Sequence, residues 1–268
     1  MRKHESFILT PITTVMDEIS IASSLHEDGV SSFPMGDYLM QSLFLRMTGF
    51  QEQKVKCILW ELATDNVDLR YERFKNKPIG EGASYSDKNT VFLDLVSCIK
   101  NCNANVDLLS DAERQKIFDD TKAYLAKFSE LSYIKSFSQR QYYEFCKIFA
   151  KCGKQCLLHI SKKNHEDKLV DMLAHCDNCA VKSSAKDWNL CKFSTIKQAY
   201  ECMIAHRNRS AHNTVSFQQN LPSLDRLRSK DYLLDNYYIR FAILMIIDQV
   251  FVQLFKKYIQ LNPESFIL

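Results

Sequence analysis

The chain is poor in the two residues that most often break helices. Only 6 of its 268 residues are glycine and 5 are proline, which is about a third of the usual glycine content and under half of the usual proline content. No segment of any weight shows the alternating apolar and polar pattern of a half-buried strand. These absences argue against a sheet fold, and we expect an all-α protein built as a helical bundle.

Long apolar runs are also missing. The N-terminal stretch MRKHESFILTPITTV begins with basic residues, but no apolar run of signal-peptide length follows them. The most apolar stretch, FAILMII at 241–247, is interrupted by Asp248, far short of the roughly twenty residues that a membrane span needs. We therefore expect a cytoplasmic protein with no membrane partner, whose 10 cysteines are mostly reduced thiols.

Apolar periodicity and capping residues predict where the helices lie. The last predicted helix is apolar on nearly every side around 241–247. This indicates a central place in the bundle or a buried self-association interface. The expected helices run from Pro11 to about residue 25, over 38–49 (capped by Asp37, ended by Gly49), 51–64, 87–103 (opened by Asp87), 111–128 (Ser110 and Glu113 as a capping box), onward from Ser138 (a second box with Gln141), in short pieces over 165–175, from Ser194 to about 207, and from Asp235 to about 261.

The loop at 75–87 is the best candidate for a domain boundary, but a single helical body is the simpler expectation. We expect residues 1–105 to form an N-terminal helical region packed on a core domain of residues 106–268.

Positive charge is concentrated in one part of the chain. The window from Lys192 to Lys230 holds seven Lys or Arg and two acidic residues, a net charge of +5, whereas the whole chain has a net charge of +3. Such a patch on a near-neutral protein fits an anionic partner or substrate at one place. The alternative is a solvated surface face with no binding role.

Within this window, the stretch AHRNRSAHN at 205–213 combines phosphate-binding and proton-transferring side chains. Arginine can donate two parallel hydrogen bonds to a phosphate, and histidine can take and give a proton near neutral pH. Cleavage of RNA without a metal needs both abilities, which makes Arg207 and His212 the candidate residues. On a continuous helix they would lie roughly 140° apart around the axis, so the helix must end or bend near Arg209, or the pair must meet across a dimer.

The residues RNRSAH, at 207–212, resemble the signature of the HEPN superfamily, which is an arginine, a polar residue and a histidine after a gap of four to six. HEPN domains are helical bundles, and many are metal-independent ribonucleases of bacterial defence and toxin–antitoxin systems. The resemblance covers about the last 130 residues and places the motif after one long helix and before another.

The resemblance implies a catalytic site of Arg207, Asn208 and His212, with the asparagine orienting one of the other two. It implies an endonuclease that leaves 2′,3′-cyclic phosphate ends, has no cofactor, works as a homodimer, and can have a regulatory or antitoxin partner. Basic residues that could bind the flanking RNA are Arg209, Lys192, Lys197, Arg226 and Arg228.

Three alternatives remain open beside the nuclease. The first is a non-catalytic HEPN module that neutralises a toxin or acts as a scaffold. The second is a helical regulator that binds nucleic acid without cutting it. The third is structural: Arg207 and His212 would only satisfy the terminal carbonyls and the dipole of a helix C-terminus.

A cysteine-rich segment offers a weaker hypothesis. Cys152 and Cys156, in KCGKQCLLH, and Cys176 and Cys179, in HCDNC, could together form a zinc site. The first pair lacks the usual knuckle and Cys156 belongs to an apolar helical run, so free buried cysteines are the expected outcome.

Overall fold

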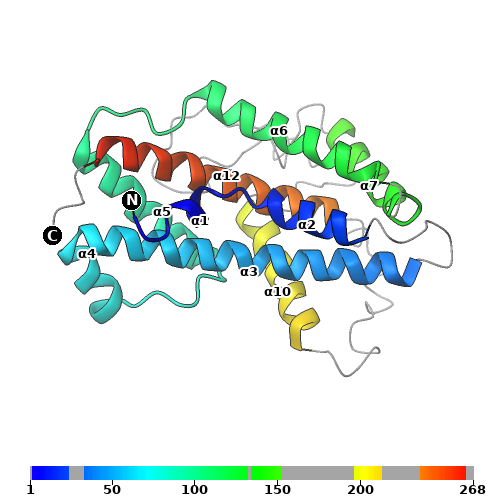
Figure 1. Ribbon diagram of the computed structural model, residues 1–268, viewed down its shortest axis with the longest axis horizontal. Coiled ribbons are helices and arrows are strands. Elements are labelled where there is room, and N and C mark those ends of the chain that lie inside the picture. The colour runs from blue at the N-terminus through cyan, green and yellow to red at the C-terminus, as the bar shows by residue number, and fades with distance from the viewer. Residues whose placement is uncertain (1, 24–32, 132–133, 152–195, 213–235, 264–268) are drawn as a thin grey trace, which may run out of the picture.

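The computed structural model describes residues 2–23, 33–131, 134–151, 196–212 and 236–263 (Figure 1). No strand occurs in these ranges, and helices make up most of them, which confirms the predicted all-α class. The elements are α1 (Glu5–Leu9), α2 (Thr13–Ser23), α3 (Phe33–Asp65), α4 (Val67–Tyr71), the π-helix η2 (Glu72–Asn76), α5 (Tyr85–Cys102), α6 (Asp111–Ser129), α7 (Lys135–Lys151), α10 (Ile196–His212) and α12 (Tyr237–Leu261).

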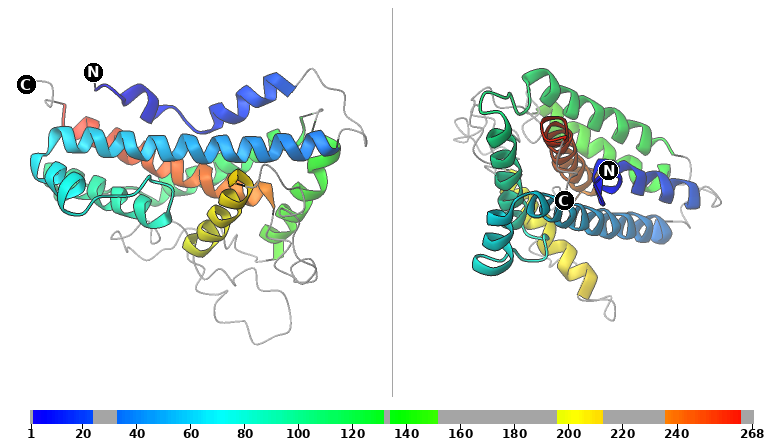
Figure 2. Two further views of the ribbon diagram at one scale, coloured as in Figure 1. Left: turned by 90° about the horizontal axis from the view of Figure 1, so that it is seen from below. Right: turned by 60° about the vertical axis from the view of Figure 1, so that its left-hand side comes forward.

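Helix α12 is the centre of the bundle. It packs against α3, α5 and α6, and also contacts α1, α7 and α10, and Figure 2 shows it enclosed by the longer helices. Each residue from Phe241 to Ile247 is at most 3% exposed. By length and composition α12 could cross a membrane, but 89% of its most apolar window is buried inside the bundle. The predicted central position is confirmed, and the apolar surface of this helix no longer argues for self-association.

A buried ion pair fixes α12 to two other parts of the chain. Asp248 and Lys54 are 0% and 1% exposed, and the Lys54 Nζ lies 2.6 Å from Asp248 Oδ1. The ammonium group also donates to the Thr10 carbonyl at 2.6 Å, while Asp248 Oδ2 accepts from the Ile12 amide at 2.9 Å. Burial raises the pKa of Asp248 and lowers the pKa of Lys54, and in each group the opposite charge of its partner works against that shift.

Helix α3 corrects two predictions. Asp37 does not open a helix and Gly49 does not end one, because α3 continues from Phe33 to Asp65. An interior glycine costs a helix about 1 kcal/mol relative to alanine. Fully buried residues on both sides of it, such as Phe44 and Ile58, offset that cost by packing in the same core.

A second glycine of α3 has a packing role. A Cβ atom on Gly36 would lie 2.7 Å from Cγ of Phe137 in α7, closer than real Cβ atoms approach another carbon. The missing side chain therefore lets α7 lie directly against α3.

Local capping signals gave mixed results. The Ser110–Glu113 box is confirmed, since the Glu113 amide donates to Ser110 Oγ and the Ser110 amide donates to Glu113 Oε2. The Ser138–Gln141 prediction is wrong, because Ser138 is buried inside α7. The helix expected from Pro11 to about residue 25 is α2, which begins at Thr13, and α1, before Pro11, was not expected.

Two further helix starts differ from the predictions. The N-cap of α5 is Ser84, whose hydroxyl accepts from the Asp87 amide at 3.0 Å, so Asp87 belongs to the first turn. The N-cap of α12 is Asn236, which accepts from the Tyr238 amide at 2.9 Å. The expected cap, Asp235, and the expected helical pieces over 165–175 lie outside the described residues.

One hydrophobic core joins the helices on both sides of residue 105. It contains Ile8, Phe44 and Leu95 from the N-terminal part together with Phe118 and Phe241. The division into 1–105 and 106–268 stays a prediction from the sequence.

Candidate functional site

The RNRSAH motif lies in the last two turns of α10. The helix begins at Ile196 and continues to His212, so the prediction that it ends near residue 207 or bends near 209 is wrong. Its described span contains no glycine or proline, and Arg207, Arg209 and Ala211 all favour helix. One end of α10 extends beyond the body of the bundle (Figures 1 and 2).

Arg207 belongs to the face of α10 that packs on the bundle. Tyr200 and Met203, seven and four residues earlier, are only 1% and 3% exposed, and this spacing puts Arg207 in the same row. A different row, formed by Glu201, Ala205 and Asn208, is exposed. Arg207 therefore points toward α3 while its neighbour Asn208 faces outward.

The Arg207 guanidinium is held by two partners. Its Nη2 lies 3.1 Å from each carboxylate oxygen of Glu52 in α3, and its Nη1 donates to Asn208 Oδ1 at 3.1 Å. The side chains of Arg207 and Glu52 are 23% and 15% exposed, so the pair lies at the edge of the core. A guanidinium has five N–H donors, so this arrangement fixes the group and still leaves donors for a phosphate oxygen.

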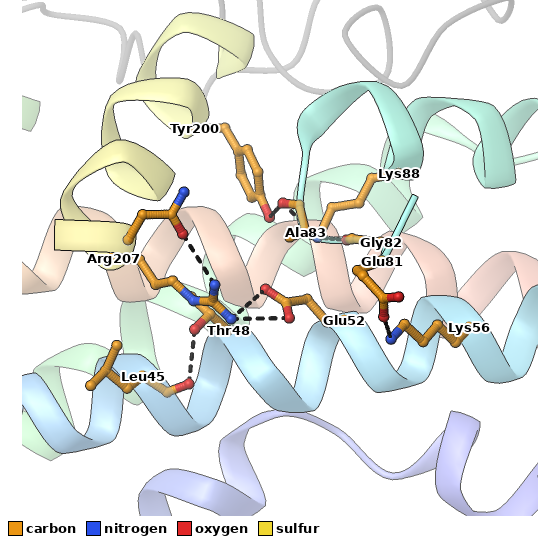
Figure 3. A network of polar contacts seen from close by, with 11 residues as sticks. Leu45, Thr48, Glu52, Lys56, Glu81, Gly82, Ala83, Lys88, Tyr200 and Arg207 are labelled. Atoms are coloured by element: carbon orange, nitrogen blue, oxygen red, sulfur yellow. Dashed lines mark hydrogen bonds and ion pairs between the residues drawn. The ribbon is translucent and has the colours of Figure 1, made fainter. Parts of the chain in front are cut away.

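The segment before α5 connects α10 to α3 and α5, as Figure 3 shows. The Tyr200 hydroxyl donates to the Ala83 carbonyl at 3.0 Å, and the Lys56 ammonium pairs with the Glu81 carboxylate. Gly82 adopts φ +77°, and a Cβ atom there would lie 3.4 Å from the Glu52 carbonyl oxygen. The positive φ and the close backbone approach both favour glycine at this position.

Lys88 is a buried cation beside the Arg207–Glu52 pair. It is 0% exposed, its Nζ donates to the Gly82 carbonyl at 2.5 Å, and it lies 5.1 Å from the centre of the Tyr200 ring. Burial lowers the pKa of Lys88 to about 8, against the opposing effect of the Glu52 and Asp87 carboxylates. Burial likewise raises the pKa of Tyr200, so its hydroxyl keeps its proton and remains a donor.

Positions 207 and 212 lie on different faces of α10. Five residues of continuous helix separate them by roughly 140° and by about 7.5 Å along the axis. By register, position 212 continues the exposed row of Glu201, Ala205 and Asn208, whereas Arg207 belongs to the inward row.

Only some of the residues predicted to bind RNA or zinc lie within the described part of the chain. Lys197 and Arg209 belong to α10. Lys192, Arg226 and Arg228 lie outside the described residues, as do the cysteines of the zinc hypothesis, Cys152, Cys156, Cys176 and Cys179. Within the described ranges no three His, Cys, Asp or Glu side chains form a metal-binding group, and four cysteines there, Cys57, Cys98, Cys102 and Cys146, are free thiols.

Sequence reasoning missed Glu52, Lys88 and Tyr200 as neighbours of Arg207. Lys88 did carry a signal, because it shares a row with Phe92, Leu95 and Ile99 at helical spacing, and a lysine in an apolar row predicts an internal partner. Glu52 carried none, since it is an ordinary polar residue within the predicted helix 51–64.

We compared the chain with profiles of known protein families, with curated proteins and with solved structures, and none of them matched.

Proposed function

We propose that this chain is a metal-independent RNA endonuclease of the HEPN type. The observation that carries the proposal is the fixed Arg207 guanidinium, held at the edge of the bundle by Glu52 and Asn208 at 3.1 Å and followed on the same helix by His212. A phosphate-binding group that is already oriented loses little freedom when substrate binds, which favours catalysis.

Each residue of the motif has a role in this proposal. Arg207 binds the scissile phosphate and stabilises the charge that develops on it. His212 removes the proton from the 2′-hydroxyl or protonates the leaving 5′-oxygen. Asn208 orients Arg207 through the contact from its side-chain oxygen to Nη1. The products are a 2′,3′-cyclic phosphate and a 5′-hydroxyl.

The continuous α10 favours a site shared between two copies. Because Arg207 and position 212 belong to different rows of one helix, Arg207 of one copy would act with His212 of another. This argument replaces the one from apolar surface on α12, which the bundle itself covers.

The same Glu52 contact also favours a second candidate function. A carboxylate neutralises Arg207 and uses it to dock α10 on α3, which is what a non-catalytic interaction module would need. Such a module keeps the motif for its structure and does not cut RNA.

Cleavage of single-stranded RNA by the purified chain in EDTA tests the proposal. We expect fragments ending in 2′,3′-cyclic phosphate and no cleavage of DNA, since the nucleophile is the 2′-hydroxyl. His212→Ala should lose at least about 10²-fold in rate, and Arg207→Lys should fail as well because an ammonium lacks the planar fork. Arg46→Ala is the matched control, since Arg46 is an exposed arginine of α3 paired with Glu18, and it should retain activity.

Mixing inactive variants tests the shared site. Exchange of subunits between Arg207→Ala and His212→Ala dimers makes heterodimers with one intact site each, so about a quarter of the wild-type activity should return. A site within one chain would return none. Absence of cleavage would favour the interaction module instead, and cleavage that requires Mg²⁺ would refute the metal-independent mechanism.

A further inference from the structure

Exposed apolar side chains gather where α3 passes into α4 and η2. Trp60, Val67, Tyr71 and Phe74 are 49%, 74%, 58% and 49% exposed. The rings of Trp60 and Phe74 lie 6.1 Å apart, and Val67 and Tyr71 are four residues apart on α4, which places them on one side of it. Single exposed apolar residues need no explanation, but a group with three aromatic rings indicates a binding surface. We refer to these four residues as the aromatic patch.

Cations are interleaved with the aromatic patch. The segment 67–77 holds four Lys or Arg and two acidic residues. Arg70 and Lys75 are exposed, and the Lys75 Nζ lies 5.4 Å from the centre of the Tyr71 ring. A surface for an apolar protein partner would not need this charge, whereas aromatic rings among cations are typical of proteins that bind single-stranded nucleic acid.

The aromatic patch and the motif are connected along one face of α3. Glu52, Lys56 and Trp60 are four residues apart in turn, so their side chains form a single row, and Figure 3 shows Glu52 and Lys56 pointing to the same side of the helix. Glu52 binds Arg207 at one end of the row, and Trp60, which belongs to the aromatic patch, contacts the Phe74 ring at the other. Lys56, between them, has a side chain that is 41% exposed, and a phosphate would replace its present partner, the exposed Glu81 carboxylate.

The length of this row matches a few nucleotides. Eight residues of α-helix rise about 12 Å, which corresponds to about three to four bases stacked at 3.4 Å. RNA whose scissile phosphate lies at Arg207 would therefore reach Trp60 with the third or fourth nucleotide from the cut.

We propose that the row from Glu52 to Trp60, with the aromatic patch, is a binding track for the single-stranded part of the RNA on one side of the cut. Bases stack on Trp60 and Phe74, and Lys56, Arg70 and Lys75 contact the phosphates. The proposal rests on the proposed function, because that function supplies the RNA and the position of the cut.

Binding is measured separately from cleavage, by fluorescence anisotropy of labelled oligouridine with the His212→Ala chain. In this background Trp60→Ala should weaken the affinity between about 5-fold and about 150-fold, the range for loss of one stacked base. Trp60→Phe should restore most of the affinity, because phenylalanine keeps a stacking face. Tyr38→Ala is the matched control, since Tyr38 is an exposed aromatic residue on the same helix, and it should bind like the parent. Circular dichroism checks that each variant is folded.

Oligonucleotide length gives a second measurement. Trp60→Ala should weaken the binding of oligouridine that is long enough to reach from Arg207 to Trp60, which takes about four nucleotides or more. It should leave the binding of a dinucleotide, which is too short to reach Trp60, unaffected. If the parent binds RNA and the Trp60 and Phe74 variants bind equally well at every length, the track is wrong. A change in self-association without a change in RNA affinity would also overturn it, and would assign the aromatic patch to protein contact.

The two proposals fail in different ways. RNA that is bound through Trp60 but is not cut by the wild-type chain would refute the nuclease and keep the track. RNA that is cut equally well by the wild type and by Trp60→Ala would keep the nuclease and refute the track. A parent chain that does not bind RNA refutes both.

Discussion

Removing both halves of the Lys54–Asp248 pair should destabilise the bundle by much less than the two single removals added together. Asp248→Leu leaves the Lys54 ammonium, 1% exposed, with the Thr10 carbonyl at 2.6 Å and the Phe50 ring at 5.0 Å as its remaining partners among the described residues. Breaking a buried ion pair in this way costs about 3–5 kcal/mol in free energy of unfolding. For a chain of this length, that corresponds to a fall in Tm of roughly 6–10 °C, at about 2 °C per kcal/mol.

The double variant Lys54→Met with Asp248→Leu should lose less stability than the two single variants added together. It removes both buried charges and keeps similar volumes, a change that is often neutral or stabilising. The Thr10 carbonyl and the Ile12 amide lose their partners, which costs about 1–3 kcal/mol each. We therefore expect the double variant to be more stable than the sum of the two single effects by at least about 2 kcal/mol.

Urea unfolding followed by far-UV circular dichroism measures all four corners of this cycle. The control cycle uses Arg46 and Glu18, which are also 2.6 Å apart but are 53% and 61% exposed, so their coupling should stay below about 1 kcal/mol. Equal coupling in the two cycles, or losses at Lys54 and Asp248 that simply add, would refute the argument that burial makes the inner pair costly to break.

Two further predictions concern other positions in the core. Gly36→Ala should destabilise the protein by about 1–3 kcal/mol through its clash with Phe137, whereas Gly49→Ala, with nothing within 4 Å of its Cβ, should stabilise it by up to about 1 kcal/mol; urea unfolding of both variants checks the contrast, and equal effects would contradict it. Lys88 has a pKa of about 8 when folded and of about 10.4 when unfolded, so the unfolded chain holds the extra proton between these values and stability gains from rising pH there. Relative to Lys88→Met, the wild type should therefore become more stable by about 2 kcal/mol from about pH 7 to about pH 10, and a difference that does not vary with pH would show that the buried lysine keeps an ordinary pKa.

The parts of the fold that local sequence determines could be predicted. The Ser110–Glu113 box needs only residues three apart, and the apolarity of α12 around Phe241 is visible in one short stretch, so both were found. Gly49 led to a wrong prediction because glycine disfavours a helix interior by about 1 kcal/mol relative to alanine. That cost is offset by the burial of Phe44 and Ile58 on either side, and this burial depends on α12, which is far away in the sequence.

In the candidate site, too, some residues could be predicted from the local sequence and others could not. The motif residues are adjacent in sequence and could be found by their chemistry, but the partner of Arg207 is Glu52, 155 residues earlier. Nothing within the sequence around either residue indicates that pairing. The fold brings α3 and α10 together, and only then does the position of the guanidinium become defined.

The central place of α12 has a consequence for how the chain is made. A ribosome synthesises α12 after every other helix in the described ranges, yet α3, α5 and α6 all pack against it. From the end of α3 to the start of α12, synthesis at about 5–20 residues per second takes roughly ten to thirty seconds. During that time apolar side chains of α3 and α5, such as Phe44 and Leu95, lack the α12 surface against which their helices pack in the finished bundle. The nascent chain is therefore a natural client for chaperones that shield apolar helices, and the core closes only once residues 237–261 have left the exit tunnel.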